Sequence, residues 1–117
     1  MELFYYSITG LLTALVAMGA TRYFVDHQWA VDEFNKLGFP EWLVYTLAVA
    51  KFAGLAAIWL VKSNTIKQWA YAGFTFNFLM AIGAHLAAGD GEAIGGGIAL
   101  VLLAGSYFFY QRIAKAA

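Results

Sequence analysis

The segment Trp42–Val61 reads WLVYTLAVAKFAGLAAIWLV and contains a single charged residue, Lys51. About 20 apolar residues in a helix are needed to cross the hydrocarbon core of a bilayer. Segments of similar length and composition also occur at Tyr5–Phe24, Trp69–Ala88 and Ile94–Tyr110. The sequence therefore predicts four membrane-spanning helices.

The composition of the whole chain supports this interpretation. Of its 117 residues, 62% are hydrophobic and 12% are charged, whereas a soluble domain has about 45–50% apolar and about 25% charged residues. A single proline, no cysteine and equal numbers of basic and acidic residues exclude a collagen, a disulfide scaffold and a nucleic-acid-binding protein. We predict an all-α integral membrane protein. It is expected to be a four-helix transmembrane bundle, with residues 1–117 forming one domain in contact with the lipid bilayer.

The connection between the first two predicted spans differs from the short turns elsewhere. Between Val25 and Glu41, the residues Ala30, Phe34 and Leu37 fall on one helical face. Gly38 suits the position after a helix C-terminus, and Phe39-Pro40 ends the segment. These features predict a short amphipathic helix between helices 1 and 2.

The distribution of basic residues predicts the orientation. The side with both termini and the turn Ser63–Thr65 carries Lys62, Lys67, Arg112 and Lys115. The opposite side carries Arg22 and Lys36. Because basic residues in short loops favour the cytoplasmic face, we predict a multi-pass cell-membrane protein with both termini in the cytoplasm.

Lys51 is the most informative polar residue, since it lies at the centre of a predicted span. A lysine at the bilayer centre costs about 2.5–3.5 kcal/mol on insertion scales, so it requires a polar environment inside the bundle. Two interpretations remain open. Carbonyl groups and water satisfy Lys51 within the bundle, or Lys51 contacts a ligand or a partner protein.

The third predicted span carries a stripe of residues at intervals of four, namely Gly73, Asn77, Ala81 and His85. Asn77 and His85 can form hydrogen bonds between helices. A proton relay or a metal site could use His85, but a histidine without cysteines or nearby acidic residues is a poor metal site. We predict no catalytic or metal-binding residue, and a polar interior made of Lys51, Asn77 and His85, joined by Arg22 and Glu41.

Small residues recur at spacings that allow helices to approach closely. They include Ala50-xxx-Gly54 in the second predicted span and Gly10-xxx-Ala14 in the first. The run Gly95–Gly97 begins the fourth span, where we expect it to allow a close helix crossing or an irregular start.

Several motifs in order resemble the DoxX-like family of small four-helix membrane proteins. The turn Leu37-Gly38-Phe39-Pro40 precedes the helix with Lys51, the block Trp69-Ala70-Tyr71-Ala72-Gly73-Phe74 leads through Asn77 to His85, and Ser106-Tyr107-Phe108 follows near the end. The resemblance implies a four-helix fold. Most relatives have no assigned activity. Some resemble subunits of thiosulfate:quinone oxidoreductases, some sit in membrane complexes with oxidative-stress enzymes, and distant animal relatives act as receptor-assembly chaperones. Many relatives carry Glu at the position of Lys51.

These observations favour a non-catalytic accessory subunit or assembly factor of a membrane complex. Its small-residue helix faces would contact a membrane protein partner or a second copy of the chain. The alternative is a pocket protein, or a membrane subunit of an oxidoreductase, that binds a quinone or lipid. A small transporter ranks third, because the first span has no Asp or Glu and Lys51 would repel a cation. No cofactor is implied by the residues themselves.

Overall fold

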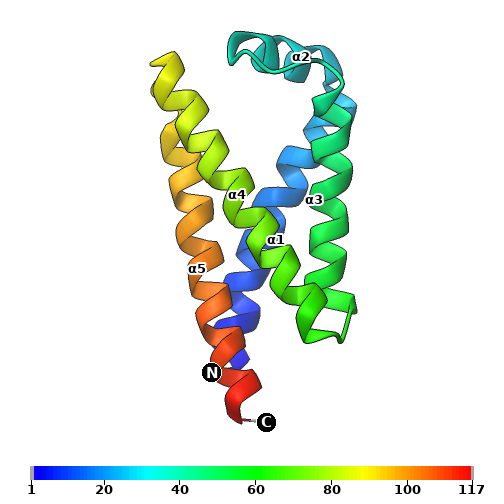
Figure 1. Cartoon of the computed structure of the whole chain (residues 1–117), viewed down its shortest axis with the longest axis vertical. Helices are drawn as coiled ribbons and strands as arrows, with labels where there is room; N and C mark the ends of the chain where they lie inside the picture. The colour runs from blue at the N-terminus through cyan, green and yellow to red at the C-terminus, as the bar shows by residue number, and fades with distance from the viewer. Residues whose placement is uncertain (1, 117) are drawn as a thin grey trace.

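The computed structural model describes residues 2–116, which form five α-helices (Figure 1). They are α1 (Glu2–Val25), α2 (His27–Lys36), α3 (Leu43–Leu60), α4 (Asn64–Ala88) and α5 (Ala93–Ala116). All except the short α2 are long and apolar enough to cross a membrane. The predicted four-helix membrane bundle is confirmed.

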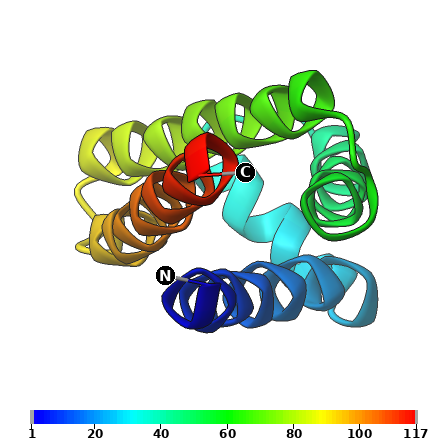
Figure 2. The same ribbon diagram turned by 90° about the horizontal axis from the view of Figure 1, so that it is seen from below.

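The four long helices form a ring. In this ring α1 packs against α3 and α5, and α4 also packs against α3 and α5. Both termini and the α3–α4 turn lie at one end of the bundle, hereafter the terminal end (Figure 1). The helix α2 and the α4–α5 turn lie at the other end, hereafter the α2 end. Figure 2 shows α2 crossing behind the space that the ring encloses.

The observed helix ends differ from the predicted spans where polar residues continue a helix. α4 begins at Asn64 rather than at Trp69, because Ser63 caps it by accepting a hydrogen bond from the backbone N–H of Ile66 at 3.4 Å. α5 continues to Ala116 rather than ending near Tyr110. Hydropathy marks the part of a helix suited to lipid, whereas capping determines where the helix itself begins.

The helix α2 buries Ala30 and Phe34 of the predicted apolar face against α1 and α3, whereas Leu37 follows the helix and is only partly buried. Its buried residues are Ala30, Val31 and Phe34. The ring of Phe34 packs edge-on against Tyr23 of α1, with 5.4 Å between ring centroids. Gly38 follows the helix with a φ of 84°, a conformation that glycine adopts without steric penalty. The prediction of a helix between helices 1 and 2 is confirmed.

Two glycines allow close contact between neighbouring helices. A Cβ atom at Gly54 of α3 would lie 2.7 Å from Cζ of Phe74 on α4. A Cβ atom at Gly96 of α5 would lie 2.9 Å from Cγ1 of Ile82 on α4. The close crossing expected for the run Gly95–Gly97 is therefore confirmed at Gly96, whereas a Cβ atom at Gly95 or Gly97 would meet nothing within 4 Å. A Cβ atom at Gly10 of α1 would likewise meet nothing within 4 Å.

Candidate functional site

A cavity of about 240 Å³ lies between α3 and α4 in the membrane-spanning part of the bundle. Its lining residues come from one face of each helix: Leu47, Ala50, Lys51 and Gly54 from α3, and Trp69, Ala70, Gly73, Phe74 and Asn77 from α4. Trp69 is 73% exposed, and Ala50 and Gly73 are also exposed. The exposure of these lining residues shows that the cavity is open at the surface of the helix bundle rather than enclosed within it.

The sequence explains why space remains here. Residues three and four apart lie on the same face of a helix, so small residues on both helices meet across the α3–α4 contact. Gly54 lets the ring of Phe74 lie against α3, since a Cβ atom at that position would overlap the ring. Ala50, Ala70 and Gly73 leave the adjoining volume unfilled.

Lys51 is the charged residue in the cavity lining. Its Nζ atom lies 4.8 Å from the centroid of the Tyr23 ring on α1, a distance at which an ammonium is attracted to the ring face. Within residues 2–116, Lys51 forms no ion pair, and no fully buried side-chain nitrogen or oxygen lacks a hydrogen-bond partner. No described residue hydrogen-bonds the Lys51 ammonium, so this nitrogen keeps some exposed surface, and the Lys51 side chain lines the cavity.

Asn77 lines the same cavity one helical turn from Gly73. Its amide provides two N–H donors and one oxygen acceptor. Leu47, the alanines and the glycines contribute no side-chain polar groups. The cavity thus combines an apolar wall with an ammonium, an amide and the indole N–H of Trp69, a composition typical of small-molecule sites.

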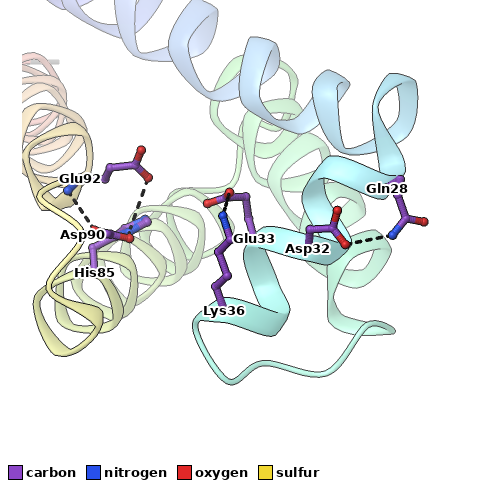
Figure 3. Close-up of polar contacts among 7 residues, drawn as sticks. All are labelled: Gln28, Asp32, Glu33, Lys36, His85, Asp90 and Glu92. Carbon is purple, nitrogen blue, oxygen red and sulfur yellow. Dashed lines mark hydrogen bonds and ion pairs between the residues drawn. The ribbon is translucent and has the colours of Figure 1, made fainter.

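His85 lies outside this cavity, at the α2 end of α4. Its Nδ1 donates to Oδ2 of Asp90 at 2.7 Å and lies 4.0 Å from Oε2 of Glu92 (Figure 3). The hydrogen bond from His85 is the main reason that the pKa of Asp90 lies below its ordinary value. The expectation that no acidic cluster lies near His85 is wrong, because Asp90 and Glu92, which follow it closely in the sequence, lie beside its ring. Ligand atoms of the three side chains lie within 4.8 Å of one another.

Arg22 and Glu41 also lie at the α2 end. The Cζ atom of Arg22 stacks 3.5 Å from the centroid of the Trp29 ring on α2. Glu41 is exposed beside His27 in the region where α3 begins. Of the residues proposed for a polar interior, the structure brings Lys51 and Asn77 together in one cavity and places His85, Arg22 and Glu41 elsewhere.

A buried hydroxyl cluster near the terminal end was not identified from the sequence. Ser106 of α5 hydrogen-bonds to Thr9 of α1 at 2.6 Å and to the Tyr71 hydroxyl of α4 at 2.7 Å. Beside this cluster, Tyr107 donates to Gln68 at 2.8 Å and accepts from Gln111 at 2.6 Å. In the sequence, these residues are visible only as isolated hydroxyl-bearing side chains within apolar segments. The sequence does not show that they contact one another.

The sequence matches the DoxX-like family over residues 7–107, a range that includes the cavity lining and the hydroxyl cluster. Neither a curated protein nor a solved structure matches it. Since the match extends over most of the chain and agrees with the four apolar helices, this small membrane protein belongs to the DoxX-like family.

Proposed function

We propose that the protein binds a small membrane-soluble molecule in the cavity between α3 and α4. The observation that carries this proposal is Lys51, a basic residue in a membrane-spanning helix that lines the cavity and has no ion-pair partner among residues 2–116. An unpaired polar group in an apolar environment is costly. A ligand that accepts hydrogen bonds from Lys51 and Asn77 would reduce this cost.

The size of the cavity limits how much of such a molecule it can hold. Its volume of about 240 Å³ is smaller than the roughly 300–1,000 Å³ of pockets that enclose a drug-sized ligand. The polar group and the adjoining part of the molecule would occupy the cavity, and the rest would extend along the lipid-facing surface of α3 and α4. Quinones and lipids have this division into a polar group and an apolar tail.

Native mass spectrometry of the protein, extracted gently from its own membranes, tests the proposal. We expect wild-type protein to retain a small molecule and Lys51→Met to lose it. Lys62→Met is the matched control, because Lys62 is exposed and lies outside the cavity. A wild-type protein that carries no small molecule under these conditions would contradict the proposal.

A cavity-filling variant tests the location separately. Gly73 lines the cavity, and a Cβ atom there would meet nothing within 4 Å. Gly73→Leu should therefore fill the cavity without disturbing the packing of the helices, and abolish ligand retention. Gly83→Leu on the same helix, also at an open position outside the cavity lining, should retain the ligand.

A second candidate function, an accessory subunit or assembly factor, is favoured by the unused small residues of α1. Gly10 has open space where its side chain would be, and Ala14 is exposed. This pair would allow a helix of a partner protein, or of a second copy, to approach α1 closely. Gly10→Leu should then release the partner during purification, whereas Gly19→Leu, on the opposite face of α1, should not. Wild-type protein that purifies as a monomer without a stoichiometric partner would contradict this role.

We also propose that the terminal end faces the cytoplasm, which the basic residues of that end support. The sequence contains no cysteine, so single-cysteine variants can report the orientation. In intact cells, a membrane-impermeant maleimide should label Glu92→Cys at the α2 end and leave Ser63→Cys at the α3–α4 turn unlabelled. The reverse pattern would overturn the proposed orientation.

A further inference from the structure

We infer that the α3–α4 cavity is a binding site for a long-chain carboxylic acid, whose carboxylate contacts Lys51 and Asn77. This inference rests on the proposed function, and it specifies the chemistry of the ligand's polar group. Three features of the structure lead to it: the charge of the cavity, its small set of donors, and the acidic residues at the α2 end.

The first feature is charge. The cavity lining has one basic residue, Lys51, and no acidic residue. The face of the Tyr23 ring, 4.8 Å from Nζ, favours the charged ammonium. Because charges interact strongly where water is excluded, a ligand with one negative charge would compensate Lys51 better than a neutral carbonyl group.

The second feature is the donor set. A carboxylate has two oxygens that accept hydrogen bonds, and the residues lining the cavity include three side chains that can donate them: the Lys51 ammonium, the Asn77 amide and the Trp69 indole. A phosphate monoester carries a charge of about −1.5 to −2 at pH 7, whereas the lining provides one basic residue, Lys51. A cavity of about 240 Å³ also favours a single-chain molecule over a phospholipid with two chains. A monocarboxylate therefore fits these residues best.

The third feature is the charge of the α2 end. The residues of that end include two basic side chains, Arg22 and Lys36, and six acidic ones, Asp26, Asp32, Glu33, Glu41, Asp90 and Glu92. Figure 3 shows acidic groups both on α2 and at the α4–α5 turn. This excess of negative charge opposes the approach of soluble anions from the water at that end. The acid would instead enter from the bilayer, with its chain along the exposed apolar side chains of α3 and α4, which include Val49, Phe52 and Phe76.

The test compares two fluorescent probes with the same chain, cis-parinaric acid and its methyl ester, on the purified full-length protein in non-ionic detergent. The acid should bind about tenfold more tightly than the ester or better. Lys51→Met should weaken binding of the acid by a similar factor and weaken binding of the ester much less, because the ester loses a hydrogen bond but no charge interaction. Asn77→Leu should weaken binding of the acid less, and Lys62→Met should change neither. Circular dichroism of each variant shows whether the helices are intact.

The outcomes separate this inference from the proposed function. If acid and ester bind equally and Gly73→Leu abolishes both, the cavity binds amphiphiles but the carboxylate inference is wrong. If phosphatidylglycerol displaces the bound acid as effectively as oleate does, the preference for a carboxylate is also overturned. If neither probe binds and the protein purifies without a small molecule, both proposals fail.

Discussion

Near the terminal end of the bundle, Ser106 hydrogen-bonds to both Thr9 and Tyr71, at 2.6 and 2.7 Å, and Thr9 and Ser106 are fully buried. Nearer the α2 end, Lys51 and Asn77 line a cavity, and Lys51 forms no ion pair within residues 2–116. Both regions place polar side chains among apolar helices. They differ in whether these side chains satisfy one another.

This difference identifies the candidate site. A polar group whose partners come from the protein adds to the stability of the bundle, because removing one partner leaves the others unsatisfied. A polar group that lines a cavity instead remains available to form a hydrogen bond with a ligand. Substitutions of polar residues in the two regions should therefore change stability in opposite directions.

The largest effect is expected for Ser106→Ala. This change removes the oxygen that bonds to both Thr9 and Tyr71, and leaving their hydroxyls unsatisfied should lower the free energy of unfolding by roughly 2–3 kcal/mol. Unfolding in mixed detergent micelles measures this change, with Ser7→Ala at an exposed position of α1 as the control. Adding Thr9→Val and Tyr71→Phe should restore part of the loss. If Ser106→Ala behaves like Ser7→Ala, the cluster does not hold the helices together.

The second largest loss of stability is expected for Gly54→Ala, at the boundary between the two regions. A Cβ atom there would lie 2.7 Å from Cζ of Phe74, whose ring is buried. Gly54→Ala should therefore lower the free energy of unfolding by about 1–2 kcal/mol through overpacking. Gly10→Ala, at an open position, is the matched control and should not be destabilising. Rescue of Gly54→Ala by Phe74→Leu would assign the loss to this contact, whereas unchanged stability of Gly54→Ala would show that the helices separate easily here.

The sequence was sufficient to predict the fold, because apolar segments about 20 residues long reveal membrane-spanning helices without knowledge of their partners. The amphipathic pattern around Ala30 and Phe34, with Gly38 after it, likewise predicted α2. The beginning of α4 was predicted less accurately, because Asn64 and Lys67 are polar and do not continue the apolar segment. The cap at Ser63 shows that the helix begins at Asn64.

The site was predicted only in part. Lys51 and Asn77 are unusual within apolar spans, and they line the same cavity. His85 is equally conspicuous in the sequence, but its partner Asp90 lies in the turn that follows α4. Thr9 and Ser106 were missed, because the meeting of residues 97 positions apart depends on helix packing that a single sequence does not display.

For Lys51→Met, in protein freed of bound lipid, we expect a smaller change in the free energy of unfolding, and an increase rather than a decrease. The change replaces an ammonium that has no ion-pair partner among residues 2–116 with an apolar side chain of similar length. It should raise the free energy of unfolding by about 1 kcal/mol, less than the full insertion cost because the cavity already relieves part of it. Exposed Lys62→Met should stay within about 0.5 kcal/mol of wild type. A loss of stability comparable to that of Ser106→Ala would mean that Lys51 is structural, and the contrast between the two regions would disappear.

The smallest effect is expected at Asp90. Its bond with His85 is 2.7 Å long, as is the bond between Tyr71 and Ser106, but Asp90 is exposed and water weakens such interactions. The hydrogen bond from His85 holds the pKa of Asp90 below its ordinary value of 3.8. A carboxyl with a depressed pKa in the folded state stabilises the protein above that ordinary value, and the contribution is lost as the pH falls below it. The unfolding midpoint of Asp90→Asn should therefore decrease less than that of wild type on acidification below pH 3.8. If the stabilities of Asp90→Asn and wild type fall equally as the pH is lowered, the hydrogen bond between His85 and Asp90 does not contribute to stability. If Asp90→Asn destabilises the protein as much as Ser106→Ala does, burial is not what distinguishes the two hydrogen bonds.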